Sequence, residues 1–424
     1  GLGYFTGLRY AAIIAAGSFF SWFVCIPIVY FLAPEHVMHI NGQSVFLADA
    51  PIRKVFLDYV RHIGIGMLAM AGIIGLLSMS KVVGNVVKKA VLDIFTSKTT
   101  EVNLLRTQRD VPTSWIGAGI LLCTVLFAVY FHFMYSESLA QTGVAFLIVL
   151  IMSFLLAVVG ISSIAYTGTE PVSGMTIFMI IISAVCLTAA GMTGKVGMIA
   201  VLMMASFIGT TIGMAGNFMS ELKVAHMTGA TPKKMEQWQI VGTILCAVLS
   251  VGVMILLNGA YGFVGDHALN APQANAMAAI IEPMMTGGSA QWPLYMAGAL
   301  FAIILWMVKV PPLAFALGTY LPMEINTPLL VGGLIAYFVQ NSTNDKALAD
   351  LRFSKGSTIA SGLVAGGAIG SLFSAVLRIA GIDVFAQEWV ETPEATYLSI
   401  VMYLLLCAFL YKVAMYIKDK KTAK

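Results

Sequence analysis

A polar interruption between residues 161 and 176, with the sequence ISSIAYTGTEPVSGMT, is the stretch best suited to binding chemistry. It places Gly168, Pro171 and Gly174 inside apolar sequence, with the carboxyl group of Glu170 between them. In hydrocarbon, an unpaired peptide N–H or C=O costs several kcal/mol, so a helix breaks there only where protein or a water-filled cavity satisfies the exposed groups. A helix that restarts at Pro171 would direct free N–H groups and its positive dipole end at the gap. We therefore expect a carboxylate-binding site here; an ordinary turn between two helices is the alternative.

A second interruption has the same plan. The stretches TEPVSGMTIF and MEINTPLLVGGLI each contain a Glu, then a Pro, then a Gly. In the second stretch, we expect Thr327 to cap a half-helix that begins at Pro328. Interrupted helices at corresponding positions point to the binding site of a transporter. Chance is the alternative explanation, because the chain contains 14 Pro and 40 Gly.

The two interruptions together could hold a zwitterion. The two helix ends would bind its carboxylate, and Glu170 or Glu324 would bind its amine or a proton. Asn217 lies in another apolar run, where it either lines the pathway or bonds only to a neighbouring helix. The candidate substrate- and proton-binding residues are Tyr166, Thr169, Glu170, Ser173, Thr176, Asn217, Tyr320, Glu324 and Asn326.

The composition determines the class of protein that must position these residues. Of the 424 residues, 59% are hydrophobic and only 10% are charged, and the mean hydropathy is +0.89. These values are typical of an all-α, polytopic transmembrane helical bundle, here with broken helices. The basic residues form short clusters between apolar runs and no long stripe, so nothing indicates a nucleic-acid partner.

Ten apolar runs are expected to cross the membrane, because each approaches or exceeds the ~20 residues that a spanning helix requires. Loops rich in Lys and Arg mark the cytoplasmic side. We expect these runs to form a single transmembrane domain over residues 1–424. The predicted spans are 3–32, 60–79, 115–135, 143–164, 171–190, 195–219, 240–257, 292–308, 356–379 and 397–416.

One apolar block does not fit a simple crossing. Lys309 and the basic loop that starts near Lys346 should both be cytoplasmic, yet only the block 311–339 lies between them. Its two arms, 311–319 and 328–339, are each shorter than the ~20 residues needed to span. We therefore predict a re-entrant hairpin near 311–340. The interruption at 161–176 is either a turn at the inner surface or the tip of another hairpin within the membrane.

Motifs for other chemistry are missing from the sequence. The five Cys lie in apolar runs without CxxC or Cys/His spacing, so we expect neither a metal site nor a cofactor. HExxH and GxSxG are both absent, so we expect no catalytic residues and no enzyme.

Several stretches resemble the oligopeptide transporter superfamily, in its prokaryotic and yellow-stripe-like branch. They are GLGYFTGLRYAAIIAAGSFFSW, GTEPVSGMTI, LKVAHMTGATPKKMEQWQIVG, NAPQANAM and FALGTYLPMEINTPLLVGGLI, in family order between Gly1 and about Gly381. The resemblance implies a secondary active, commonly proton-coupled importer, of which this chain is the C-terminal portion, with further helices upstream. Thr169 and Glu170 stand where the family usually has an Asn pair, which could add a protonatable group.

The expected function is therefore proton-coupled transport of small oligopeptides or related zwitterions through the inner (plasma) membrane of a prokaryote. Transport of a siderophore-like metal–chelate is the alternative; an intramembrane enzyme or a passive channel is less favoured. The expected partners are the substrate, protons and the lipid bilayer, and the oligomeric state stays open.

Overall fold

The computed structural model describes residues 1–32, 34–40, 43–78, 106–108, 110–136, 138–167, 172–263, 271–287, 291–382 and 392–416, with isolated positions between 80 and 88 and at 389. The chain divides into two compact units. Unit 1 contains residues 1–64, 248–271 and 309–424, and unit 2 contains residues 65–247 and 272–308. The units are described separately below.

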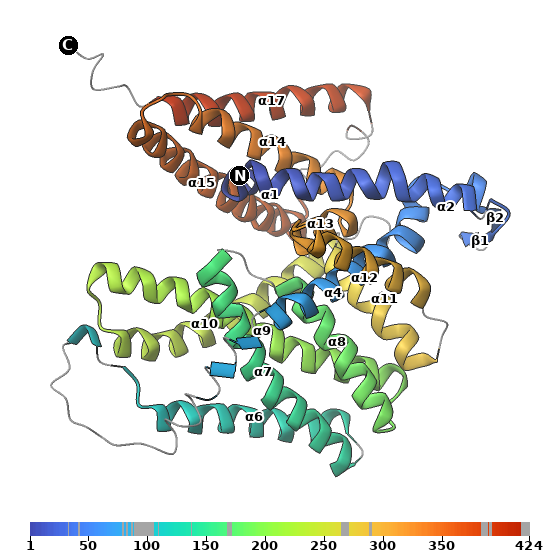
Figure 1. The fold of residues 1–424 in the computed structure, drawn as a ribbon, viewed down its shortest axis with the longest axis vertical. Helices are drawn as coiled ribbons and strands as arrows, with labels where there is room; N and C mark the ends of the chain where they lie inside the picture. The colour runs from blue at the N-terminus through green and yellow to red at the C-terminus, as the bar shows by residue number, and fades with distance from the viewer. Residues whose placement is uncertain are drawn as a thin grey trace. The chain divides into compact units, whose positions relative to one another are not determined.

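Unit 1 begins with one long helical segment that changes its winding partway. A π-helical turn interrupts it, and a short antiparallel hairpin follows, with Val37 opposite Phe46. The elements in order are α1 (Leu2–Phe19), η1 (Phe20–Cys25), α2 (Ile26–Leu32), β1 (Val37–Ile40), β2 (Gln43–Phe46), η2 (Leu47–Asp49), α3 (Ile52–Val55) and a second π-helical turn, η3 (Phe56–Val60) (Figure 1). Cys25, Ile26, Leu47, Val55 and Phe56 form a shared apolar core, which joins η1 and α2 to η2, α3 and η3.

The remainder of unit 1 is helical. Besides the end of α10 (Pro232–Tyr261), it contains α13 (Pro312–Tyr320), α14 (Met323–Gln340), α15 (Lys346–Ile379) and α17 (Pro393–Met415). Helix α1 packs along α13, α14 and α15, and α15 also packs on α14 and α17 (Figure 1). Tyr4, Ala336, Val339, Ala360 and Leu410 form the core between these helices.

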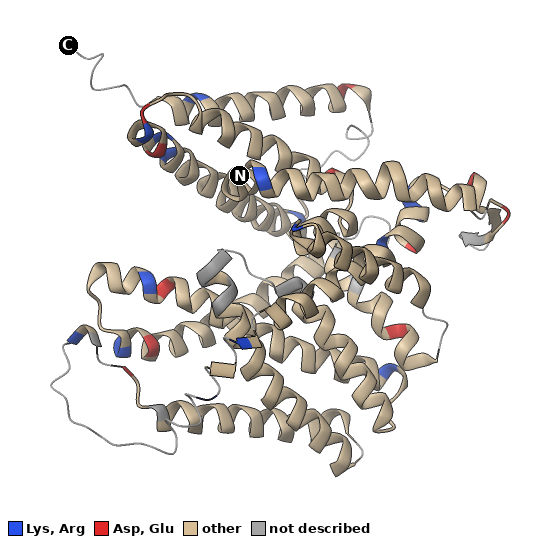
Figure 2. Ribbon diagram, in the orientation of Figure 1, with Lys and Arg blue, Asp and Glu red and all other residues tan. Residues whose placement is uncertain are grey.

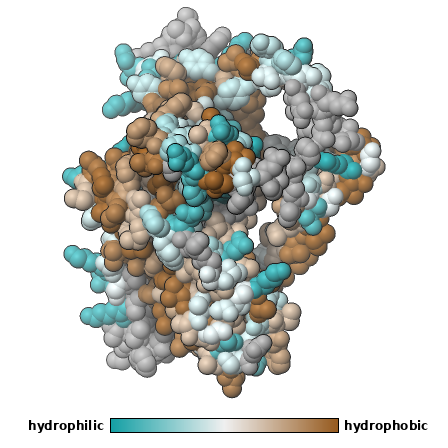
Figure 3. Space-filling view, turned by 90° about the vertical axis from the view of Figure 1, so that its right-hand side faces the viewer, coloured by the Kyte–Doolittle hydropathy of each residue, from teal (hydrophilic) through white to brown (hydrophobic). Residues whose placement is uncertain are grey.

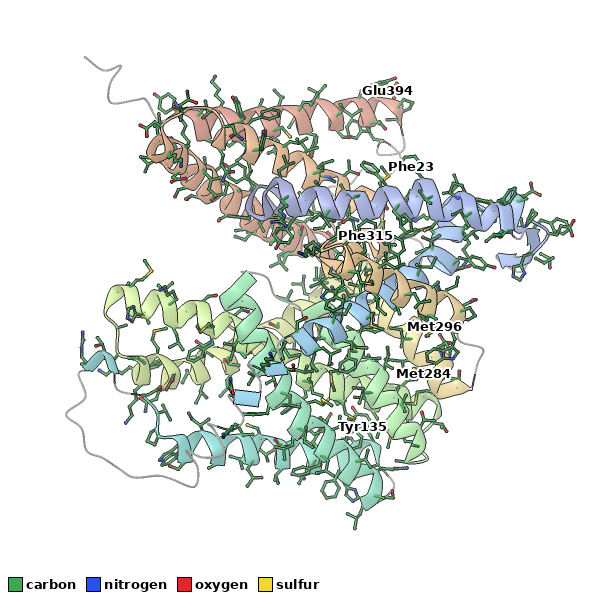
Figure 4. The ribbon with its side chains drawn as sticks, viewed as in Figure 1. Phe23, Tyr135, Met284, Met296, Phe315 and Glu394 are labelled. Atoms are coloured by element: carbon green, nitrogen blue, oxygen red, sulfur yellow. The ribbon has the colours of Figure 1, made fainter. Side chains whose placement is uncertain are left out.

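Unit 2 is built around α9. Its elements are most of α4 (Arg61–Ser78), η4 (Arg106–Gln108), α6 (Thr113–Tyr135), α7 (Leu139–Thr167), α8 (Val172–Ala189), α9 (Gly194–Thr228), the first half of α10, α11 (Pro272–Thr286) and α12 (Trp292–Met307). Helix α9 packs against α6, α7, α8 and α11. Figure 4 locates Tyr135 at the end of α6, Met284 on α11 and Met296 on α12.

The helices have the length and composition of membrane spans. Within the described residues, eight helical segments are long and apolar enough to cross a bilayer, and three shorter apolar helices accompany them. Charged residues lie mostly towards helix ends (Figure 2), while hydrophobic residues cover broad parts of the surface (Figure 3). The prediction of a polytopic helical membrane protein is therefore confirmed; the number of crossings stays a prediction.

Several predicted spans are shorter than the helices that contain them: α10 already starts at Pro232 and α15 at Lys346, where spans were expected from residues 240 and 356. The second span was expected from residue 60, but its helical segment already starts at Ile52. Beyond the predicted end of the sixth span at residue 219, helix α9 likewise continues to Thr228. There Gly229 adopts a left-handed conformation (φ 69°), which ends the helix in a way that glycine permits without steric cost.

Candidate functional site at a broken helix

The break between α13 and α14 in unit 1 is a two-residue extended segment. Helix α13 ends at Tyr320, Leu321 (φ −81°, ψ 145°) and Pro322 (φ −56°, ψ 146°) are extended, and α14 starts at Met323. Proline disfavours the helical conformation of the residue before it, so Pro322 forces α13 to end. The sequence prediction of a broken helix here is confirmed.

The predicted start of the second half-helix was wrong. Pro328 lies inside α14, and the Oγ1 of Thr327 donates to the carbonyl of Met323 at 2.7 Å, so Thr327 is no cap. Because Pro328 has no N–H, the carbonyl of Glu324 loses its usual helical donor. The second arm is therefore 18 residues long, which corresponds to about 27 Å of helix. A helix pair exists at 312–340; its re-entrant path stays a prediction.

A buried amide closes the break. The side chain of Asn326 is 1% exposed, and its Nδ2 donates to the Oγ of Ser18 (2.6 Å) and to the carbonyls of Gly318 (3.1 Å) and Leu321 (3.2 Å). The Oγ of Ser18 donates in turn to the Gly318 carbonyl at 2.8 Å. The three acceptors around the nitrogen fix the orientation of the amide. Its Oδ1 has no hydrogen-bond partner among the described residues.

Glycines bring α1 and α13 into backbone contact beside this amide. A Cβ atom added to Gly17 would overlap the carbonyl oxygen of Phe315, and one added to Gly318 would overlap the carbonyl oxygen of Ile14. Small residues permit this close approach of helices within a membrane. The approach explains how Ser18 on α1 reaches the carbonyl of Gly318.

The buried cation Arg61 contacts Tyr320, the last residue of α13 before the break. Arg61 is 8% exposed and Tyr320 is 1% exposed. The Nη2 of Arg61 donates to the Oη of Tyr320 at 3.2 Å, and the guanidinium carbon lies 5.1 Å from the centre of the tyrosine ring. A Cβ atom added to Gly64 would lie 2.8 Å from the Cα of Tyr320, so α4 also touches the backbone at the break. The attraction between a cation and an aromatic ring is stronger when the cation is removed from water.

Two π-helical turns border the same region. The ring of Trp22 in η1 stacks on that of Phe56 in η3, with 5.3 Å between their centres. Such turns occur frequently at functional sites. Beside them is an open pocket of about 680 Å³, whose lining includes Met323, the first residue of α14. Phe23, which lines the pocket, lies on η1, and Phe315 lies on α13 (Figure 4).

The structure brings together two of the residues predicted from the sequence. Tyr320 and Asn326 are both buried at the α13–α14 break. Glu324 lies in the first turn of α14 and is exposed, where its charge complements the positive end of the helix.

The other predicted residues lie in unit 2. Thr176 is buried on α8, and a Cβ atom added to Gly209 of α9 would lie 3.6 Å from its Oγ1. Asn217 is exposed on α9. Helix α7 is described as far as Thr167 and helix α8 from Val172; the residues between them, in the middle of the predicted interruption at 161–176, lie outside the described residues. Thr169 and Glu170, together with the side chains of Tyr166 and Ser173, lie outside the described residues.

Sequence reasoning missed Ser18 and Arg61. Arg61 is 259 positions from Tyr320, so no local pattern connects them. The available signal was an arginine within the apolar segment 52–78, because ionisable residues in spanning helices are rare and functional.

The chemistry of this site is that of binding. Its described groups are a guanidinium, a tyrosine hydroxyl, a serine hydroxyl and an amide with an unpaired oxygen. Among the described residues, no three His, Cys, Asp or Glu side chains are arranged to hold a metal ion. Donors and acceptors of this kind recognise a polar ligand by hydrogen bonds and charge.

Comparison with known proteins identifies the relatives of this chain. The family model described as "OPT oligopeptide transporter protein" matches residues 1–378. A Haemophilus influenzae protein named "Putative oligopeptide transporter" is 26% identical over 92% of this chain and 66% of its own length. No solved structure matches the chain.

Two plant proteins also match, over shorter stretches. The "Probable metal-nicotianamine transporter YSL5" of Arabidopsis thaliana is 29% identical over 44% of this chain and 28% of its own length. The corresponding "YSL11" protein of Oryza sativa subsp. japonica is 27% identical over 41% of this chain and 26% of its own length. The chain thus spans about two thirds of the bacterial relative and less than a third of each plant relative.

The family match covers most of the chain, and the described helices have the length and composition of membrane spans. The chain therefore belongs to the oligopeptide transporter (OPT) family, whose members are integral multi-pass membrane transporters and not enzymes.

Proposed function

We propose that the chain forms the substrate-binding part of a secondary active transporter that moves small oligopeptides or related zwitterions, coupled to protons, through the inner (plasma) membrane of a prokaryote. The observation that carries this proposal is the buried polar break between α13 and α14, where Asn326 and Ser18 are 1% and 2% exposed inside an apolar helix bundle. Polar groups inside spanning segments mark substrate and ion pathways. Membership of the family supports the same function.

The candidate residues take distinct roles in this proposal. Tyr320 and Asn326 contact the substrate at the break. Glu170 or Glu324 binds the proton or the substrate amine. The remaining side chains that line the pathway are Tyr166, Thr169, Ser173, Thr176 and Asn217.

Uptake by proteoliposomes containing the full chain tests the proposal. We expect a radiolabelled dipeptide to accumulate against its gradient when the vesicle interior is made alkaline, because inward proton flow would then drive transport. Glu170→Gln or Glu324→Gln should remove this dependence on the pH gradient, since an amide cannot bind a proton at neutral pH. Full gradient dependence in both variants would exclude both carboxyl groups from coupling.

Glu394 supplies a matched control for Glu324. Both carboxylates are exposed and lie in the first turn of a helix, Glu394 at the start of α17 (Figure 4). Glu394→Gln removes the same favourable charge from the start of a different helix. We expect its uptake and gradient dependence to equal those of the wild type.

A metal–chelate substrate is the second candidate. The similarity to two plant proteins named as metal-nicotianamine transporters favours it. Competition separates the candidates: excess unlabelled dipeptide should abolish uptake of labelled dipeptide, whereas excess iron–nicotianamine should not. Stronger competition by the chelate would select the second candidate.

A further inference from the structure

We infer that Arg61 is the carboxylate-binding residue of this site and that the free amide oxygen of Asn326 receives a donor group from the same ligand. This inference rests on the proposed function and deepens it, because it names the chemistry that distinguishes the substrate: a small molecule with a terminal carboxylate and an N–H or ammonium donor.

The position of Arg61 is unusual for a cation. Arg61 is the tenth residue of the helical segment 52–78, which has the apolar character of a membrane span. Its side chain is 8% exposed. Burial of a charge is costly, and in membrane proteins buried ionisable residues face the protein interior or a cavity and mark substrate sites.

Tyr320 contacts the guanidinium of Arg61 in two ways. The hydroxyl accepts one N–H at 3.2 Å, and the ring lies 5.1 Å from the guanidinium carbon. The planar fork of a guanidinium matches the two oxygens of a carboxylate, and the pair gains strength where water is excluded. A guanidinium that Tyr320 already holds in place loses less conformational entropy when the carboxylate binds.

Asn326 supplies the complementary group. Its nitrogen is engaged by three acceptors, while its Oδ1 is buried and without a hydrogen-bond partner among the described residues. A buried acceptor left unpaired carries the free-energy cost of its lost hydration. A ligand that donates an N–H to this oxygen would recover that cost on binding.

Both groups adjoin the same short piece of chain. Arg61 bonds to Tyr320, and Asn326 bonds to the carbonyls of Gly318 and Leu321 on either side of it. Met323, at the start of α14, lines the apolar pocket of about 680 Å³, which could receive apolar substrate side chains. The arrangement fits a short peptide: charge at one end, an amide or ammonium donor, and variable apolar side chains.

Binding of matched dipeptides to the purified full chain tests the inference directly. The probes are alanyl-alanine and alanyl-alanine amide, which differ only in the terminal carboxylate, and binding is read from ligand-induced thermal stabilisation. We expect wild-type protein to bind the free acid about tenfold or more tightly than the amide. Arg61→Gln should weaken binding of the free acid to the level of the amide, and leave binding of the amide unchanged.

Arg378→Gln is the matched control. Arg378 lies over the ring of Tyr261 at the same 5.1 Å, but it is at the end of α15 and half-buried. We expect it to keep the wild-type preference for the free acid. Asn326→Leu should weaken both probes equally, because both carry the amino group and the peptide N–H.

The outcomes separate this inference from the proposed function. Equal binding of acid and amide by wild type, binding of neither, or an unchanged acid preference in Arg61→Gln would overturn the inference. If Arg61→Gln does not fold, Arg61→Lys is tested in its place. Weaker binding of the free acid, with binding of the amide unchanged, supports the inference. Unchanged binding of both probes overturns it. Arg61-dependent binding without uptake into vesicles would reject transport and leave the binding site standing.

Discussion

Among the described residues of unit 1 are two arginine–tyrosine pairs with the same stacking distance and different surroundings. In each, the guanidinium carbon lies 5.1 Å from the ring centre. Arg61 and Tyr320 are buried at a helix break, whereas Arg378 and Tyr261 are half-buried where α15 and α10 end. A cation in the last turn of a helix is stabilised by the helix dipole and needs no further role. The stacking contact alone therefore does not identify a binding site. Burial of the pair, and its contact with the backbone at a helix break, distinguish a binding site from a charged residue that only stabilises a helix end.

Removal of the two rings should give the largest difference. Tyr320→Ala should lower the free energy of unfolding by about 3–5 kcal/mol, because it empties a fully buried aromatic position. Tyr261→Ala should cost about 1 kcal/mol, as expected where the site is already partly open. Denaturant titration in detergent micelles measures both values. Similar losses in the two variants would show that burial does not distinguish the pairs.

Each pair also has a neighbouring glycine. Replacing these glycines should change the free energy of unfolding by intermediate amounts. A Cβ atom at Gly64 would lie 2.8 Å from the Cα of Tyr320, whereas one at Gly259 would lie 3.7 Å from the Cδ1 of Ile379, an ordinary contact. Gly64→Ala should therefore destabilise by about 1–3 kcal/mol through overpacking. Gly259→Ala should be neutral, or stabilise by up to about 1 kcal/mol through helix propensity. The same titration checks this; a tolerated Gly64→Ala would argue against backbone contact between α4 and the break.

The smallest effect should come from the hydroxyl groups alone. Tyr320→Phe removes the acceptor of the Arg61 bond and should cost about 1.5 kcal/mol, as expected for a bond to a charged group. Tyr261→Phe removes the hydroxyl that shares a bond of 3.1 Å with Ser374, and should cost about 0.5 kcal/mol. Both rings stay in place, so the difference reports the hydrogen bonds. Equal costs would mean that the bond to Arg61 contributes no more than a neutral one.

The sequence predicted the helices well because apolar runs and Gly or Pro interruptions are local signals. It predicted the break that follows Tyr320. It chose the wrong proline for the start of α14, because Pro322 and Pro328 are both compatible with a first helical turn, and only the packing of Asn326 against Ser18 favours the earlier start.

The cationic side of the site could not be predicted from local patterns. The predicted second span starts at residue 60, which places Arg61 at a span boundary. The structure continues the helix back through η3 to Ile52, which moves Arg61 inside the segment. Its contact with Tyr320 depends on tertiary packing between elements far apart in the chain.

The glycine contacts of α1 also limit how this part of the protein can move. Gly17 meets Phe315, Gly318 meets Ile14, and Gly3 meets Leu329, in each case at main-chain atoms. Helices whose main chains touch have no intervening layer of side chains that could change rotamer to permit gradual sliding. Displacement of α1 by even one residue would bring a Cβ atom against a carbonyl group. Any cycle of conformations must therefore carry α1, α13 and the start of α14 as a single rigid piece, with its bending confined to neighbouring segments.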